Sequence, residues 1–230
     1  NLKRMYGDLD QELAEAPAAA VQHHHNAFPG GYLDHVLRVY DISVEMTKTF
    51  HAFEGELNFT SQELQFATLH HDLGKLGDPG EPYYMEQDSE WHRKNRGEIF
   101  THNGELSYMT VTDRAIFLLG QFQIPMSENE YIGLRLTDGL YEEANKNYYI
   151  SWNPDWGLKS NIAYILHQAD SMATHIEYDE WRHGENKEEV EVKERVRNIK
   201  KAVDVEDNKE DDVLIKKHKD LFEELFGDKS

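Results

Sequence analysis

The chain has 230 residues, of which 39% are hydrophobic and 30% charged, a composition that fits one large domain or one domain with an appendage. Its formal net charge of −20 argues against a long, nonspecific grip on nucleic acid, and the absence of cysteine excludes disulfides and thiolate metal sites. Because we find no apolar run of membrane-spanning length and no signal segment, we expect a cytoplasmic protein without a membrane partner.

The first long helix is predicted over residues 32–51, after a partly helical segment at 1–16 and a glycine-rich turn at 28–31. Apolar residues recur at helical spacing on two faces of this helix, which is typical of a helix at the centre of a bundle. His35 lies on one of these faces, near the helix start. A histidine there is either a hydrogen-bonded core residue or a metal ligand, depending on the groups that face it.

The most informative stretch is His70–Lys75, which reads HHDLGK. A capping box formed by Thr60 and Glu63 predicts the start of the helix that ends in this stretch. Adjacent His and Asp side chains at a helix end can both reach one divalent metal, the first with an imidazole nitrogen and the second with a carboxylate oxygen. The lysine then places a cation near any anion that the metal binds.

Further helices are predicted over residues 113–122, 131–136 and 161–176, after a glycine- and proline-rich loop at 74–90. The helix at 161–176 carries one continuous apolar stripe, and Asp170 lies at its margin. An acidic side chain in this position is costly unless it is paired or bound to a metal.

The composition changes from residue 179 onward, and residues 184–230 are rich in Glu, Asp and Lys. We therefore expect a helical domain over residues 1–183 and a charged helical C-terminal extension over residues 184–230. A terminal amphipathic helix is predicted at 213–226. Its apolar face either docks back onto the domain or forms a partner surface, including a contact in a homo-oligomer.

Four candidate metal ligands are spread over three predicted helical segments: His35, His71, Asp72 and Asp170. Two imidazoles and two carboxylates suit an octahedral divalent ion with open water positions. A helical bundle can bring ligands from several helices to one point. The sequence therefore predicts an all-α bundle that holds a divalent metal ion, without distinguishing Mn, Mg, Co, Ni, Fe and Zn.

This pattern resembles the HD superfamily of metal-dependent phosphohydrolases, whose signature is H…HD…D. Three blocks within residues 17–175 are similar to the HD domain of 3′→5′ exoribonucleases: Pro17-Ala18-Ala19 with His25 and Gly30-Gly31-Tyr32-Leu33-Asp34-His35, His71-Asp72-Leu73-Gly74-Lys75, and His167-Gln168-Ala169-Asp170. The chain is also similar to uncharacterised HD proteins of tailed phages, which would place it in a host cytoplasm. The resemblance implies an HD-domain helical bundle and selects His71, rather than His70, as the ligand beside Asp72.

A second metal site is left open by the resemblance. Two-metal members of the superfamily carry two further His ligands between the HD pair and the last Asp. His92 matches one of them, Asp138 stands in the place of the other, and His102 is a spare candidate. We therefore expect one metal site, with a second at His92 and Asp138 as an alternative.

The resemblance implies hydrolysis of a phosphoester or phosphoanhydride bond. Asp72 would hold the metal and orient its water, and Lys75 would neutralise charge on the phosphoryl group. The candidate substrate-binding residues are His25, Lys75, Arg93 and Arg96. Forked guanidinium groups match phosphate geometry, although the two arginines equally fit a solvated face and His25 a loop histidine.

The expected substrate is a small phosphorylated molecule, preferably a nucleotide, or else a short nucleic-acid 3′ end. An HD-type di-iron oxygenase is an alternative that needs a complete second metal site. A noncatalytic metal-containing binding protein is the other alternative, and it predicts no pocket beside Lys75.

Overall fold

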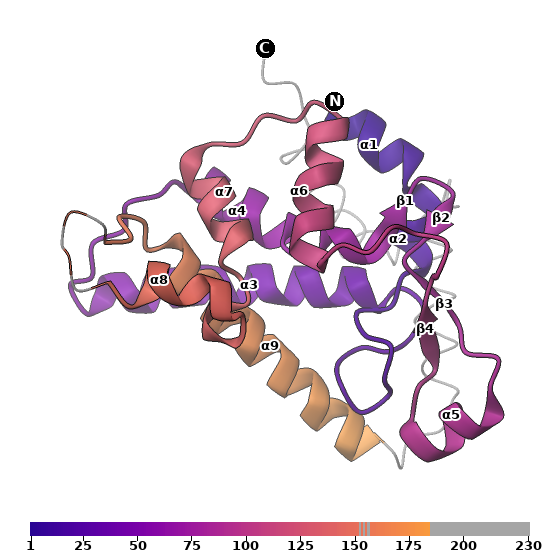
Figure 1. Cartoon of the computed structure of the whole chain (residues 1–230). Helices are drawn as coiled ribbons and strands as arrows, with labels where there is room; N and C mark the ends of the chain where they lie inside the picture. The colour runs from indigo at the N-terminus through magenta and orange to yellow at the C-terminus, as the bar shows by residue number, and fades with distance from the viewer. Residues whose placement is uncertain (152, 154, 156, 185–230) are drawn as a thin grey trace, which may run out of the picture.

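The computed structural model describes residues 1–151, 153, 155 and 157–184 (Figure 1). Within these residues the chain is mainly helical, which confirms the helical class expected from the sequence. No helix in this part of the chain is long and apolar enough to cross a membrane. Residues 185–230, which hold nearly all of the predicted charged extension, lie outside the described residues, so self-association through its terminal helix stays a prediction.

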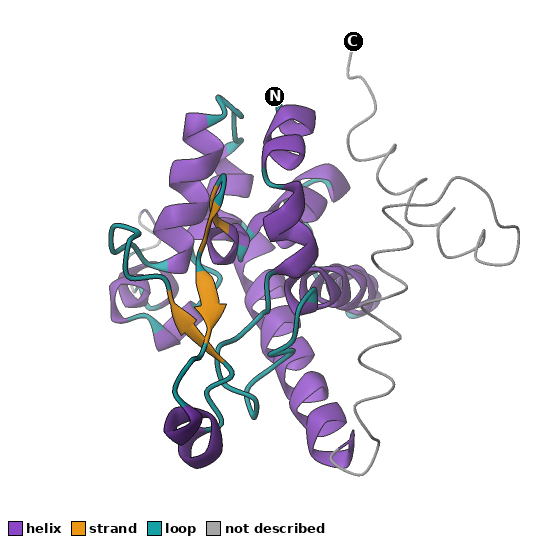
Figure 2. Ribbon diagram, turned by 90° about the vertical axis from the view of Figure 1, so that its right-hand side faces the viewer, coloured by secondary structure: helices purple, strands orange, loops and turns teal. Residues whose placement is uncertain are grey.

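Helices form the body of the molecule, and short strands lie on one side of it (Figure 2). The α-helices are α1 (Leu2–Asp8), α2 (Asp10–Glu15), α3 (Gly31–Ala52), α4 (Ser61–His70), α5 (Glu90–Arg96), α6 (Val111–Gln121), α7 (Glu128–Arg135), α8 (Lys146–Tyr149) and α9 (Ile162–Gly184). The 3₁₀-helices are η1 (Leu73–Leu76), η2 (Gly139–Tyr141) and η3 (Glu143–Asn145).

The strands form small antiparallel pairs, β1 (Gly77–Asp78) with β2 (Glu81–Pro82) and β3 (Tyr84–Glu86) with β4 (Phe100–His102). The region 74–90, expected to be a long ordered loop, therefore contains most of a 3₁₀-helix and three short strands. Short paired strands of this kind give no periodic sequence signal, because two or three residues are too few to alternate.

Helix α3 crosses the middle of the molecule, with α4, α6 and α7 on one side and α9 on the other (Figure 1). Tyr32 and Val36 of this helix belong to a hydrophobic cluster that includes residues of α1, α4, η1 and α6. Val39 belongs to a second cluster, shared with α4 and α9. The two apolar faces read from the sequence thus serve two core clusters, and α3 is central because it contributes to both.

Paired caps set the starts of α4 and α7. Thr60 Oγ1 accepts a hydrogen bond from the Glu63 amide at 3.2 Å, and the Glu63 carboxylate accepts one from the Thr60 amide at 2.8 Å. Ser127 and Glu130 repeat this capping box at α7. The Ser127 hydroxyl also donates to Glu63 at 2.7 Å, which joins the two helix starts. The path of α4 toward the HHDLGK stretch is therefore anchored at its beginning.

Gly74 lets the turn after α4 approach α6 closely. A Cβ at this position would overlap the Val111 carbonyl oxygen, so the backbone of α6 or of the turn would have to shift. We expect Gly74→Ala to lower the free energy of unfolding by about 1 to 3 kcal/mol, as overpacked sites do. Chemical denaturation measures this change.

Gly120→Ala on α6 is the matched control for that substitution. A Cβ at Gly120 meets no atom within 4 Å, so we expect a gain of about 0.5 kcal/mol from the better helix propensity of alanine. Similar stability changes in the two variants would contradict the close approach at Gly74.

Candidate metal centre

Four side chains from three parts of the chain meet near the start of α3. His35 comes from the second turn of α3, His71 and Asp72 from the junction of α4 and η1, and Asp170 from α9. His35 Nε2 lies 3.2 Å from Asp170 Oδ1 and 3.5 Å from Asp72 Oδ2. His71 Nε2 lies 3.8 Å and 3.6 Å from the same two oxygens. Ligands about 2.1 Å from one ion are about 3.0 to 3.4 Å apart, so these separations are close to those of a coordination shell.

Both imidazoles are oriented by their other ring nitrogen. His35 Nδ1 donates to the Glu177 carboxylate at 3.0 and 3.2 Å, and His71 Nδ1 donates to the Thr68 carbonyl oxygen at 2.7 Å. The Nε2 atom of each ring is buried, and apart from the contacts with the carboxylates of Asp72 and Asp170 it has no hydrogen-bond partner among the described residues. Buried polar atoms without a partner are costly. Histidines that bind a metal through one ring nitrogen ordinarily donate the N–H of the other to a carboxylate or a backbone carbonyl, as both rings do here. The donor set therefore fits a divalent metal ion.

Glu177 is a part of the centre that the sequence analysis missed. Its side chain is fully buried, binds His35 Nδ1, and lies 3.3 Å from the guanidinium Nε of Arg38. Glu177 follows Asp170 by seven residues, which is two helical turns on the same face of α9. A second carboxylate seven residues after Asp170, on the same apolar stripe, is the sequence signal that could have identified Glu177. Helix α9 therefore orients one candidate ligand, His35, and supplies another, Asp170.

The carboxylates around His35 stabilise positive charge at this ring. Burial disfavours the imidazolium, but Asp170 and Glu177 outweigh this effect and raise the pKa of His35 to about 9. In turn, although burial opposes it, His35 and His71 hold the pKa of Asp170 below its usual range. The centre therefore favours a cation between the imidazoles and the carboxylates, and a divalent ion would replace the proton on His35.

Lys75 lies at the border of this cluster. Its Nζ donates to Asp72 Oδ2 at 2.5 Å and to His25 Nε2 at 3.3 Å. Burial opposes the charge of Lys75, but Asp72 and Tyr84 raise its pKa, so the ammonium is retained. Burial and the neighbouring Lys75 lower the pKa of His25 to about 3, which keeps this imidazole neutral. Lys75 is thus a fixed cation beside the cluster, and His25 is one of its acceptors.

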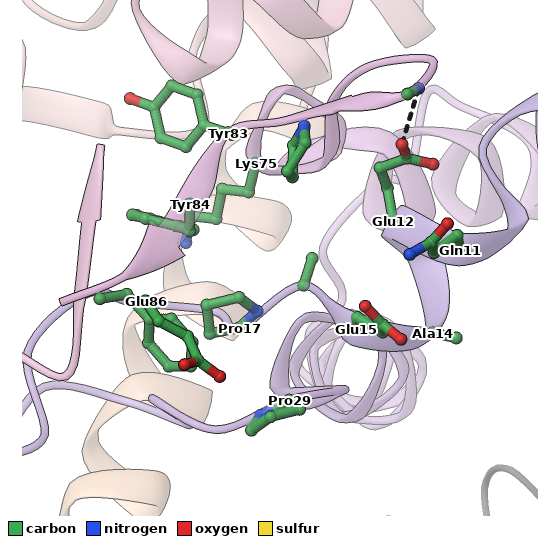
Figure 3. A pocket seen from close by; sticks show the side chains of 14 residues that line it. Gln11, Glu12, Ala14, Glu15, Pro17, Pro29, Lys75, Tyr83, Tyr84 and Glu86 are labelled. Carbon is green, nitrogen blue, oxygen red and sulfur yellow. Dashed lines mark hydrogen bonds between the residues drawn. The ribbon is translucent and has the colours of Figure 1, made fainter. Parts of the chain in front are cut away.

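A cavity of about 370 Å³ opens beside Lys75. Figure 3 shows Lys75 and Tyr84 on one side of it, with Glu15, Pro17 and Glu86 on the others. Its lining therefore combines Lys75 with carboxylate side chains and with proline and aromatic rings.

A second cavity, of about 640 Å³, lies at His25. Besides His25, it is lined by His23, His24, Thr174, His175, Tyr178 and Asp179. Lys75 lines the first cavity and contacts Asp72. His25 lines the second cavity and its ring nitrogen lies close to ligand atoms of His35 and Asp72. Each cavity therefore adjoins the candidate centre through one of these two residues.

The predicted second-site residues lie outside the groups of ligand atoms that could hold a metal within the described residues. Asp138 accepts a hydrogen bond from Thr112 at 3.3 Å, and burial together with the carboxylates of the cluster raises the pKa of Asp138. His92 lies on α5, and the ring of His102 in β4 stacks on Tyr84 at a centroid distance of 5.3 Å. The structure therefore does not bring His92, Asp138 or His102 together into a second ligand group.

Arg93 and Arg96, the candidate phosphate-binding arginines, are exposed on α5. The guanidinium carbon of Arg96 lies 5.5 Å from the centroid of the Trp91 ring. Nη1 of the same guanidinium lies 3.4 Å from Oε1 of Glu98. Neither arginine lines the two cavities described above. Their contact with a substrate phosphate stays a prediction.

His70 takes a packing role next to the centre. Its Nδ1 donates to the Phe66 carbonyl oxygen at 2.7 Å, and its Nε2 accepts from the Tyr6 hydroxyl at 2.8 Å. Burial lowers the pKa of His70 to about 4, so the ring is neutral. With both nitrogens engaged, His70 joins α4 to α1 and has no lone pair for a metal.

The structure thus brings His35, His71, Asp72 and Asp170 into one cluster, with Lys75 at its border. Such a cluster can bind a divalent cation and present an ammonium to an anionic ligand of that cation. Comparison with known proteins adds no relative to this geometry: no family model, curated protein or solved structure matches the chain.

Proposed function

We propose that this chain is a metal-dependent phosphohydrolase of the HD type. The observation that carries the proposal is the pair of buried Nε2 atoms, on His35 and His71, which face two carboxylates and have no other partner among the described residues. The metal would be held by these two histidines with Asp72 and Asp170. The order of the four residues follows the H…HD…D signature, which supports the same class.

The surrounding residues suit a phosphorylated substrate. A divalent ion held by these residues would polarise a phosphoryl oxygen and lower the pKa of its bound water. The ammonium of Lys75, held beside Asp72, would balance negative charge that develops on the phosphoryl group. The strongly acidic chain favours a nucleotide or a short nucleic-acid 3′ end over a long nucleic acid.

Two observations favour this function over the alternatives. A di-iron oxygenase would need a complete second site, whereas the other ligand group among the described residues, His25 with His35 and Asp72, shares His35 with the first. A noncatalytic binding protein predicts no pocket beside Lys75, whereas a cavity of about 370 Å³ lies there.

A metal-reconstitution assay tests the proposal. The full chain would be stripped with a chelator and reloaded separately with Mn, Mg, Co, Ni, Fe or Zn. Each form would be incubated with nucleoside mono- and triphosphates, cyclic dinucleotides and short oligonucleotides. We expect release of phosphate or nucleotide that stops on chelation and returns with metal. Failure of every metal to support release from any of these substrates would contradict the proposed function.

A further inference from the structure

The described residues contain two overlapping groups of ligand atoms. One consists of His35, His71 and Asp170, and the other of His25, His35 and Asp72, with the ligand atoms of each group within 4.8 Å of one another. Both groups depend on His35. Its Nδ1 is committed to Glu177, so only Nε2 is available, and one imidazole nitrogen coordinates one ion. The two groups are therefore alternative positions for a single ion.

The Lys75 ammonium contacts one of these two groups. Lys75 Nζ is hydrogen-bonded to Asp72 Oδ2 at 2.5 Å and to His25 Nε2 at 3.3 Å, which are two of the three members of the second group. The hydrogen bond from Lys75 uses the His25 lone pair that a metal would need. The ammonium also repels a second cation at short range. Lys75 is largely buried, so moving its ammonium away would leave the buried charge without its partners Asp72 and His25.

We propose that the Lys75 ammonium excludes the divalent ion from the His25–His35–Asp72 position and confines it to the side of His71 and Asp170, with Asp72 Oδ2 shared between the ion and the ammonium. His25 is then a latent metal ligand that becomes available when the ammonium is removed. This inference rests on the proposed metal centre, and it names Lys75 as the residue that decides where in the centre the ion lies. The ligand is a divalent cation with affinity for imidazole and carboxylate, such as Co²⁺ or Zn²⁺.

A double-mutant cycle on metal affinity tests this inference without any activity assay. Co²⁺ binding to the full chain would be followed by calorimetry and by the visible absorption of the bound ion. In the wild-type chain and in Lys75→Arg, His25→Ala is expected to change the Co²⁺ dissociation constant by less than about twofold. In Lys75→Ala, the same substitution is expected to weaken binding about tenfold or more and to shift the visible absorption bands, because His25 has become a ligand.

The controls separate folding, nonspecific binding and the metal centre itself. His24→Ala removes an exposed histidine next to His25 that belongs to neither ligand group. We expect it to leave Co²⁺ affinity unchanged in the wild-type chain and in every Lys75 variant. Lys75→Met removes the charge while keeping the aliphatic volume, so it replaces Lys75→Ala if the latter does not fold by circular dichroism.

Three results would overturn the inference. His25→Ala could weaken binding equally in wild-type and charge-free backgrounds, which would make His25 an ordinary ligand. It could have no effect in either background, which would place His25 out of reach of the ion. In both cases the proposed hydrolase would stand. Absence of Co²⁺ binding by the wild-type chain would overturn the metal centre, and with it both proposals.

Discussion

Replacing Asp72 with asparagine is expected to lower kcat/KM for metal-dependent hydrolysis by a factor on the order of 1000. Oδ2 of Asp72 lies 3.5 Å from His35 Nε2, 3.6 Å from His71 Nε2 and 2.5 Å from Lys75 Nζ, so one atom serves the metal position and the ammonium together. Asparagine keeps the shape of the side chain but removes its charge. The variant should therefore bind metal more weakly and leave Lys75 with a neutral neighbour.

Asp41→Asn provides the comparison for this variant. Asp41 lies exposed on α3, the helix that carries His35, and its replacement makes the same change in net charge. We expect hydrolysis by Asp41→Asn to stay within about twofold of the wild-type rate, as for ordinary surface changes. Steady-state rates and metal affinity would be measured for both variants. Retention of wild-type activity by Asp72→Asn would show that the chemistry takes place elsewhere.

Loss of Glu177 is expected to be the most damaging change for stability. Glu177→Ala leaves His35 Nδ1 and the Arg38 guanidinium without their buried carboxylate, and breaking such a pair costs about 3 to 5 kcal/mol of unfolding free energy. Glu177→Gln keeps a hydrogen-bond acceptor but lowers the basicity of the imidazole. This conservative variant should fold and bind metal about 10- to 100-fold more weakly.

Glu180→Gln separates this effect from the loss of an ion pair with Arg38. Glu180 is one turn nearer the C-terminus of α9 and binds the same guanidinium at 2.9 Å, but its side chain is 52% exposed. Solvent screening limits such a pair to about 1 kcal/mol or less, and we expect no change in metal affinity. Thermal denaturation and metal titration of the three variants provide the comparison. Equal effects of Glu177→Gln and Glu180→Gln on metal affinity would contradict the orienting role of Glu177.

Local sequence signals accounted for much of the helical framework. The two apolar faces over residues 32–51 indicated a central helix, and α3 indeed contributes to both core clusters. The capping box at Thr60 marked the start of α4 because its hydrogen bonds join residues only three apart. Signals of this range can be read from the chain because they need no information about distant segments.

Other features of the fold and of the candidate site depended on contacts between segments far apart in the sequence. Phe117 belongs to a helical apolar pattern, yet its side chain is 42% exposed, because the packing of α6 against η1 decides which residues face inward. The contact of Lys75 with His25 joins residues 50 positions apart, and that of Glu177 with His35 joins residues 142 positions apart. No local pattern specifies partners at such separations.

The sequence by itself determined the types and order of the four candidate ligand residues and the helices that carry them, because helical periodicity, caps and a short motif are local properties. Only the tertiary structure decided that their ligand atoms meet, since His35 and Asp170 come together through the packing of α3 against α9. It also decided which ring nitrogen faces the metal position and that Lys75 stands between Asp72 and His25. These features depend on burial and on the directions of hydrogen bonds, which exist only once the helices have packed.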